Sequence, residues 1–259
     1  MTANDPLWEM ICTEARDTGS QEPLMGGFID TAILCHKSLQ QALCFNLSRQ
    51  LHSSVMSAGA VAEVLAEAMD SDDRICDAAR TDIHACFDRD PACDNHFMPI
   101  LYFKGFQALQ LYRVSHWLWL QGRNHLALYL QSQISEVFAV DIHPGAKIGS
   151  GIMIDHATGL VIGETAIVGD DVSILHSVTL GGSGCIKGSR HPTIGKGVMI
   201  SAGAKILGNI VVGDGVKVGA GSLVLESVPA HVTVAGVPAK IVGAPREAAP
   251  AFEMDQHLR

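Results

Sequence analysis

The chain has 259 residues, of which 47% are hydrophobic and 17% charged, and its formal net charge is −9 at pH 7. This size suits one large domain or two ordinary ones, and the composition is that of a globular protein. The negative charge argues against a nucleic-acid partner, which would need a positive surface. No run of about 18 apolar residues is present, so we expect no membrane span.

The seven cysteines are odd in number and contain no CxxC pair. A disulfide framework or a zinc site is therefore not expected, and a reducing compartment fits best. The first residues, Met1 to Asp5, lack a basic segment followed by an apolar core. We therefore expect no signal peptide and a cytoplasmic protein.

Residues 1–138 are expected to form an all-α oligomerisation domain of six to eight helices. Apolar residues between Val61 and Met69 follow the i, i+3, i+4, i+7 pattern of an amphipathic helix. A second such helix follows the polar break at 70–73, with Ser71 or Asp72 as its cap. Residues 99–138 read as two further helices separated near Gly122. The aliphatic surface of the whole N-terminal half is larger than one chain is expected to bury, which indicates oligomerisation.

In residues 139–243 aliphatic residues recur at six-residue intervals in three series. This period fits neither a helix nor a simple strand, but it does fit a stacked solenoid in which three short strands make one coil. Known solenoids of this kind are left-handed. The sequence thus predicts an α + β chain in which an all-α domain precedes a left-handed parallel β-helix. The six-residue positions are Ile142, Ile148, Ile154; Ile162, Val168, Ile174, Leu180; Ile194, Ile200, Ile206, Val212, Val218 and Val224.

The repeat is interrupted twice. Ile162 follows Ile154 by eight positions, and Ile194 follows Leu180 by fourteen, where six would continue the pattern. Extra residues in a stacked coil must loop outward. The first interruption contains Asp155 and His156, and the second is a protruding loop at about 182–192. These two loops are where chemistry is expected.

Several motifs resemble those of the serine O-acetyltransferases, and they cover nearly the whole chain. In the solenoid they are VDIHP (140–144), DHATG (155–159), GET (163–165), SVTLGG (177–182), RHP (190–192) and AGAKILGN (202–209). In the helical half they are DPA (90–92), LYFKGF (101–106) and YRVSHWLW (112–119). The resemblance implies transfer of an acetyl group from acetyl-CoA to L-serine, giving O-acetyl-L-serine and CoA, the first step of cysteine biosynthesis.

The acceptor hydroxyl needs a base as it attacks, and histidine can accept a proton near neutral pH. The resemblance implies that His156 is this base and that Asp141 orients its ring, as in a Ser-His-Asp triad. From the residues alone, His156 could equally be a surface histidine in a turn. Asp141 could equally cap the first coil.

L-Serine is a zwitterion, so its site needs both charges. Arg190 suits the carboxylate because guanidinium donates in a planar fork. Asp90 and Asp155 suit the ammonium group. His191 could hold the substrate or support developing charge. The resemblance places these four residues at the substrate site, with Glu164 nearby, although a structural role in its turn is comparable for Glu164.

The resemblance implies that acetyl-CoA lies between neighbouring chains of a homotrimer or a dimer of trimers. Backbone groups near Gly182 and Ala202 would hold the pantetheine arm, and Lys217 and Lys240 could meet the phosphates. For either lysine a solvated surface role is as good an interpretation. No metal is expected: His143, His176 and His231 fall in different contexts, without His-x4-His spacing.

The resemblance also implies feedback inhibition by L-cysteine, which differs from serine by one atom. In the family the tail can bind cysteine synthase through a terminal isoleucine. Here residues 244–259, expected to be flexible, end in Leu258 and Arg259, so the usual anchor is absent and the sequence leaves this complex possible but doubtful. Two alternatives remain open. One is an acetyltransferase of this solenoid class acting on another hydroxyl, such as that of a sugar, and the other is a scaffold with idle loops.

Overall fold

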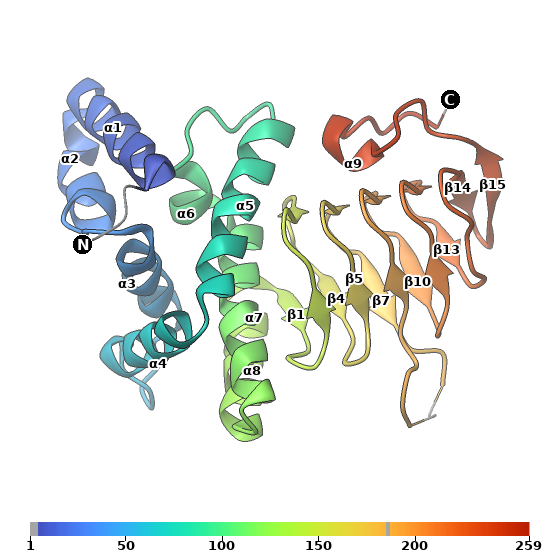
Figure 1. The fold of residues 1–259 in the computed structure, drawn as a ribbon, viewed down its shortest axis with the longest axis horizontal. Coiled ribbons are helices and arrows are strands. Elements are labelled where there is room, and N and C mark those ends of the chain that lie inside the picture. Colours follow the sequence, from blue (N-terminus) through green and yellow to red (C-terminus); the bar gives the residue numbers. More distant parts are fainter. Residues whose placement is uncertain (1–4, 185–186, 259) are drawn as a thin grey trace.

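The computed structural model describes residues 5–184 and 187–258. Helices up to Phe138 precede a solenoid of short strands that starts at Val140 (Figure 1). No helix in the described ranges is long and apolar enough to cross a membrane. The helices are α1 (Pro6–Gln21), α2 (Pro23–Ile29), the π-helical turn η1 (Asp30–Leu34), α3 (Leu39–Leu51), α4 (Ala58–Ser71), α5 (Asp73–Arg89), α6 (Met98–Tyr102), α7 (Lys104–Leu120), α8 (Asn124–Phe138) and α9 (Pro250–Glu253).

The two amphipathic helices predicted from residues 61–86 are confirmed as α4 and α5. Asp72 caps α5, since its side chain accepts a hydrogen bond from the Arg74 backbone. Residues 99–138 differ from the prediction, because they contain three helices. Phe103 is extended between α6 and α7, whereas the break near Gly122, at φ +75°, is confirmed.

The strands form three sheets that make the sides of a prism and are parallel except for the last strand of the chain, which confirms the predicted left-handed parallel β-helix. The five-stranded sheet contains β1 (Val140–Ile142), β4 (Leu160–Ile162), β7 (Thr179–Gly181), β10 (Lys205–Leu207) and β13 (Leu223–Val224). The four-stranded sheet contains β2 (Lys147–Ile148), β5 (Ile167–Val168), β8 (Thr193–Ile194) and β11 (Val211–Val212). The six-stranded sheet contains β3 (Met153–Ile154), β6 (Ser173–Ile174), β9 (Met199–Ile200), β12 (Lys217–Val218), β14 (Thr233–Gly236) and β15 (Ala239–Gly243).

The aliphatic side chains of the repeat stack in columns inside the prism. In the six-stranded sheet Ile154 pairs with Ile174, Ile174 with Ile200, and Ile200 with Val218. All four are at most 5% exposed. Burial of such a side chain contributes roughly 1.5–3 kcal/mol, so the columns supply much of the stability of the solenoid.

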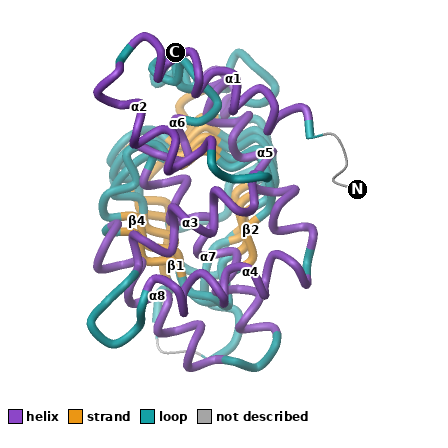
Figure 2. Tube along the Cα trace, turned by 90° about the vertical axis from the view of Figure 1, so that its left-hand side faces the viewer, coloured by secondary structure: helices purple, strands orange, loops and turns teal. Residues whose placement is uncertain are grey.

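The helices and the first coil meet in a buried polar contact. Asp82 on α5 is fully buried and pairs with Arg113 on α7 at 2.7 Å. Its other oxygen accepts a hydrogen bond from the Ile152 backbone at 2.9 Å. The view along the solenoid in Figure 2 has α5 and α7 across its first coils. This contact fixes α5, whose C-terminal end carries Asp90, against the coil that carries His156.

The segment after β15 folds back over the six-stranded sheet, in contrast to the flexible tail that the sequence predicts. Ser173 Oγ donates to the Ala251 carbonyl at 2.8 Å, and the Arg89 guanidinium lies 4.4 Å from the Phe252 ring centroid. Lys217 Nζ donates to the His257 carbonyl and lies 3.6 Å from Asp255 Oδ2. Lys217 is only 5% exposed. It therefore contacts the tail here, in contrast to the solvated surface role that was one of the two interpretations from sequence.

Candidate active site

His156 lies in the turn that leads from β3 to β4. We call the turns between the six-stranded and five-stranded sheets the first corner (155–159, 175–178, 201–204 and 219–222). His156 and Ala157 both have left-handed backbone, with φ of 55° and 59°. Residues other than glycine adopt this conformation at a cost, and such strain is concentrated at functional sites. The His156 side chain is 73% exposed, so its ring is accessible to a ligand.

Two carboxylates lie beside His156. Asp90, at the end of α5, and Asp155 line a cavity of about 430 Å³ together with His156, Tyr102 and Lys104. Burial raises the pKa of Asp155, and the nearby Asp90 raises it further, whereas His156 acts to lower it. The site thus concentrates negative charge in a partly enclosed space, which suits an ammonium group.

A second group of polar residues lies where the five-stranded sheet turns toward the four-stranded sheet. We call these turns the second corner (143–146, 163–166 and 182–192). Arg190 Nη2 pairs with Glu164 Oε2 at 2.5 Å. The hydrogen bond from Arg190 lowers the pKa of Glu164. Glu164 therefore orients the guanidinium and stays ionised.

Thr165 fixes the end of the long loop. Its Oγ1 accepts hydrogen bonds from the Arg190 and His191 backbones at 3.0 and 3.2 Å. The Thr165 backbone donates to His191 Nδ1 at 3.2 Å, so this nitrogen is an acceptor and the hydrogen of the neutral ring is on Nε2. Burial lowers the pKa of His191, with Arg190 adding to the effect. A Cβ at Gly163 would lie 2.1 Å from Nε2, so only glycine lets the ring pack there.

Asp141 lies on β1, on the five-stranded side between the two corners. Its Oδ1 accepts a hydrogen bond from Gln131 on α8 at 2.7 Å. The acidic group closest to His156 is instead Asp155, with 3.7 Å between His156 Nδ1 and Asp155 Oδ1. Among the described residues, no hydrogen bond or ion pair joins the first-corner group to Asp141 or to the second-corner group within one chain.

Of the candidate CoA contacts, Ala202 lies at the first corner and Gly182 at the second, whereas Lys217 and Lys240 lie on strands of the six-stranded sheet. Strand pairing places His156, His176, Ala202 and Ala220 at equivalent positions of successive coils, and we call this set the first-corner column. Gly182 lies at the second corner, where a Cβ would approach the Arg190 carbonyl at 3.4 Å. Lys240 is exposed on β15, whereas Lys217 is covered by the tail.

Three residues near these groups have no role in the predictions from sequence. Lys104 Nζ donates to Thr158 Oγ1 beside His156. His143, at the second corner, accepts a hydrogen bond from the Gly145 backbone at 3.0 Å, and burial lowers its pKa. Thr165 is the third. All three lie within the motifs that carry the family resemblance, and the hydrogen bonds of Lys104 and Thr165 reach residues 54 and 25–26 positions away.

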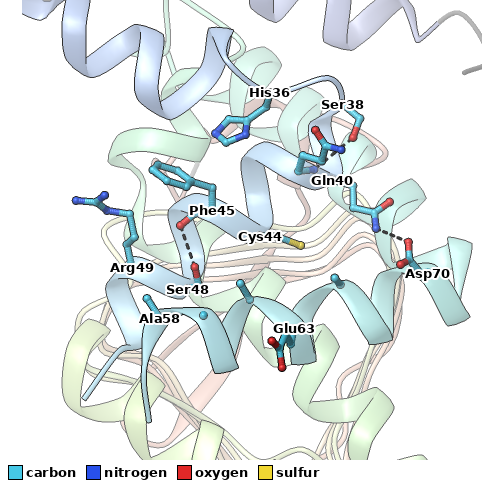
Figure 3. A pocket seen from close by; sticks show the side chains of 14 residues that line it. His36, Ser38, Gln40, Cys44, Phe45, Ser48, Arg49, Ala58, Glu63 and Asp70 are labelled. Carbon is cyan, nitrogen blue, oxygen red and sulfur yellow. Dashed lines mark hydrogen bonds between the residues drawn. The ribbon is translucent and has the colours of Figure 1, made fainter. Parts of the chain in front are cut away.

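A separate hollow of about 810 Å³ lies between α3 and α4 (Figure 3). His36, Phe45 and Arg49 line one side, and Ala62 and Glu63 the other. None of the predicted site residues lines it. In the described part of the chain, no cluster of three or more histidine, cysteine or acidic side chains could hold a metal ion.

Comparison with known proteins matches both halves of the chain. A family model described as serine acetyltransferase, N-terminal, matches residues 7–111. A second, described as bacterial transferase hexapeptide (six repeats), matches residues 191–226. Serine acetyltransferases of Salmonella typhimurium and Escherichia coli K12 are each 55% identical over 252 residues, which is 97% of this chain and 92% of each relative.

Solved structures with ligands are also similar. A serine acetyltransferase in complex with cysteine has a TM-score of 0.95 and 51% identity, covering 97% of this chain and 98% of its own. The Brucella abortus enzyme in complex with coenzyme A has a TM-score of 0.90 and 49% identity, covering 93% and 96%. The Neisseria gonorrhoeae enzyme in complex with serine has a TM-score of 0.88 and 49% identity, covering 92% and 98%. The likeness therefore extends across both helices and solenoid.

Proposed function

The chain belongs to the serine acetyltransferase family, and from that premise we propose how its residues transfer an acetyl group from acetyl-CoA to the hydroxyl of L-serine. The observation that carries the proposal is the exposed imidazole of His156 beside the Asp90–Asp155 pair in one cavity. This arrangement offers a base next to a site for an ammonium group, as an amino-acid acceptor needs.

His156 acts as the general base. It accepts the proton of the serine hydroxyl as the oxygen forms a bond to the acetyl carbon. The carbon–sulfur bond then breaks, and His156 returns the proton to the sulfur, giving O-acetyl-L-serine and CoA. Such base catalysis contributes on the order of 10²–10⁴-fold in rate.

The substrate's charges are matched by the two corners. Asp90 and Asp155 take the ammonium group at the first corner, and Arg190, oriented by Glu164, takes the carboxylate with its forked donors. His191 presents its Nε2 hydrogen toward the same substrate. L-Cysteine, with sulfur in place of the hydroxyl oxygen, fits the same contacts and acts as a competing inhibitor. A relative binds cysteine in its solved structure.

The site is completed between two copies of the chain. The first corner of one protomer faces the second corner of its neighbour, and Asp141 of that neighbour orients His156. This pairing accounts for two complementary groups that, among the described residues, share no hydrogen bond or ion pair within one chain. It requires a homo-oligomer, for which we propose a trimer or a dimer of trimers with subunit contacts through the helical domain 1–138 and the solenoid 139–243.

The acetyl donor lies along the first-corner column. Beyond His156 and His176 the column continues with small residues, Ala202 and Ala220, and a Cβ at Gly221 would meet nothing within 4 Å. This leaves room for the pantetheine arm, with Gly182 of the neighbouring chain opposite and the exposed Lys240 available to phosphates at the far end. A reducing cytoplasm, in which buried thiols such as Cys76 and Cys86 stay unpaired, suits this reaction.

The proposal is tested by following CoA release with L-serine and acetyl-CoA. We expect turnover in the wild type and a fall of about 10²–10⁴-fold in kcat for His156→Ala, because the base is lost. Replacing L-serine by a sugar acceptor should give no release above the background. Wild-type turnover in His156→Ala would rule out this histidine as the base.

A further inference from the structure

The first-corner column contains a second histidine directly next to His156. Ile154 pairs with Ile174 and Ile174 with Ile200, so His156, His176 and Ala202 follow at equivalent positions. The Gly203 backbone donates to the His176 carbonyl at 2.9 Å, which keeps the register through the turn. Neighbouring strands are about 4.8 Å apart, so His176 lies one coil from the proposed base, on the side toward Ala202.

The two rings face each other edge to face, with their centroids 5.9 Å apart and their planes at 66°. His176 Nδ1 is buried and has no hydrogen-bond partner among the described residues. A buried N–H without an acceptor costs more than an unused lone pair. The favoured neutral ring therefore carries its hydrogen on Nε2, as a donor that no described residue uses.

We propose that His176 donates a hydrogen bond from Nε2 to the thioester carbonyl oxygen of the acetyl donor and stabilises the negative charge that develops there. The inference rests on the proposed function, and it gives the acetyl end a position between His156 and Ala202. Edge-to-face rings at this separation are in contact and leave no gap between them, so the acetyl group would lie beside both rings, within hydrogen-bond reach of each.

His176 keeps its proton during the reaction. The serine oxygen bonds to the acetyl carbon, its proton passes to His156, and the carbonyl electron pair moves onto the oxygen that His176 holds. When this pair returns, the carbon–sulfur bond breaks and the sulfur takes the proton from His156. His176 thus serves as an oxyanion donor, a role whose loss typically lowers kcat by about 10²–10³-fold.

The arrangement favours direct contact with the ligand over an effect through His156. The His176 side chain makes no hydrogen bond to His156, Asp155 or any other described residue, so it has no means of fixing the orientation of the base. The residue that follows it in the column is Ala202, which cannot supply a side-chain donor.

The test compares His176→Met, which removes the donor at similar length, with His176→Gln, which keeps an amide donor. His125→Met, an exposed histidine on α8, is the matched control. We expect His176→Met to lose about 10²–10³-fold in kcat with KM values for both substrates within a few-fold. His176→Gln should recover most of the loss, and His125→Met should match the wild type. His176→Ala replaces His176→Met if the latter does not give a cooperative melting transition.

Wild-type kcat in a folded His176→Met or His176→Ala would overturn the inference. An effect confined to KM for acetyl-CoA would also overturn it, because such an effect indicates ground-state binding only. A loss of kcat in His176→Gln equal to that in His176→Met would overturn it as well. These outcomes are separate from a failure of the proposed function. If the wild type did not acetylate L-serine, both proposals would fail, whereas an active wild type with an equally active His176→Met removes only the role of His176.

Discussion

The ionised form of Asp155 destabilises the folded chain, and its proposed role in binding an ammonium group explains why a carboxylate lies there. Burial and the neighbouring Asp90 both raise the pKa of its carboxyl group. The folded chain therefore binds this proton more tightly than the unfolded chain does. The protonated carboxyl group therefore stabilises the folded chain when the pH is below the pKa of Asp155 in the unfolded chain. This stabilisation is lost as the pH rises through the higher pKa of Asp155 in the folded chain. At neutral pH the ionised group opposes folding while it is available to an ammonium group.

We therefore predict that Asp155→Asn raises the melting temperature at pH 7 while weakening the enzyme. The amide removes the unfavourable buried charge, so the gain over the wild type should shrink as the pH falls toward the ordinary range of aspartate. KM for L-serine should rise about 10–100-fold, because a charge-assisted hydrogen bond is lost. Calorimetry at several pH values, with steady-state kinetics, checks both effects. A lower melting temperature at pH 7 would contradict the proposed cost.

The sequence indicates where several candidate site residues lie, but it does not indicate their hydrogen-bond partners. His156, Asp155 and Arg190 stand at interruptions of a six-residue repeat, and an interruption must leave the regular wall. The hydrogen bonds of Thr165, by contrast, reach residues 25 and 26 positions later. Such bonds depend on the coil register across an inserted loop, which the residue types alone do not determine.

The solenoid strands could be predicted well because each hexad places one aliphatic side chain inward. The helical part was harder, since its limits depend on contacts with the solenoid. Gly105 is an example: a Cβ there would lie 2.1 Å from the Ile154 carbonyl oxygen. Gly105 lies in the first turn of α7, which follows the extended Phe103, and hydrophobic spacing within residues 99–138 does not reveal this close approach.

The tail of the chain, residues 250–258, packs across the six-stranded sheet, and we call this segment the strap. Its Phe252 lies against Arg89, whose buried side chain also bonds to Ser173 at 3.2 Å and Asp171 at 3.3 Å. Burial lowers the pKa of Arg89. The ring therefore covers a buried cation at the end of the same helix that bears Asp90.

Phe252→Ala should release this strap without unfolding the solenoid. A cation–π contact contributes about 0.5–2 kcal/mol, enough to shift a short terminal segment but not a stacked core. We expect faster tryptic cleavage at the exposed Arg246 and a nearly unchanged melting temperature. Phe28→Ala is the control, because Phe28 is 45% exposed and Phe252 is 47% exposed. Equal cleavage rates in the two variants would show that Phe252 does not hold the tail.

At the scale of the whole molecule, the proposed function divides the site into two halves that lie at different corners of one chain. The exposed base and two carboxylates are at the first corner, and the cation with its oriented imidazole is at the second. An assembly with cyclic symmetry brings unlike surfaces of adjacent copies together at every interface. The number of complete sites then equals the number of interfaces.

Mixing two inactive variants tests this arrangement. His156→Ala and Arg190→Ala should each be nearly inactive alone. After unfolding and refolding together in equal amounts, a random cyclic assembly should recover about one quarter of wild-type activity, because one interface in four pairs both intact residues. Refolding each variant separately and then mixing is the control. No recovery in the co-refolded sample would indicate that each site lies within one chain.

The ends of the solenoid have a consequence for solubility. A parallel coil leaves unpaired backbone groups at its first and last strands, and such edges accept further strands from other molecules. Here α8 packs against β1 at one end. At the other end β15 runs antiparallel to β14 and turns the last edge of the six-stranded sheet away from the stacking direction. We expect these two coverings to hinder the addition of further strands at both ends of the solenoid.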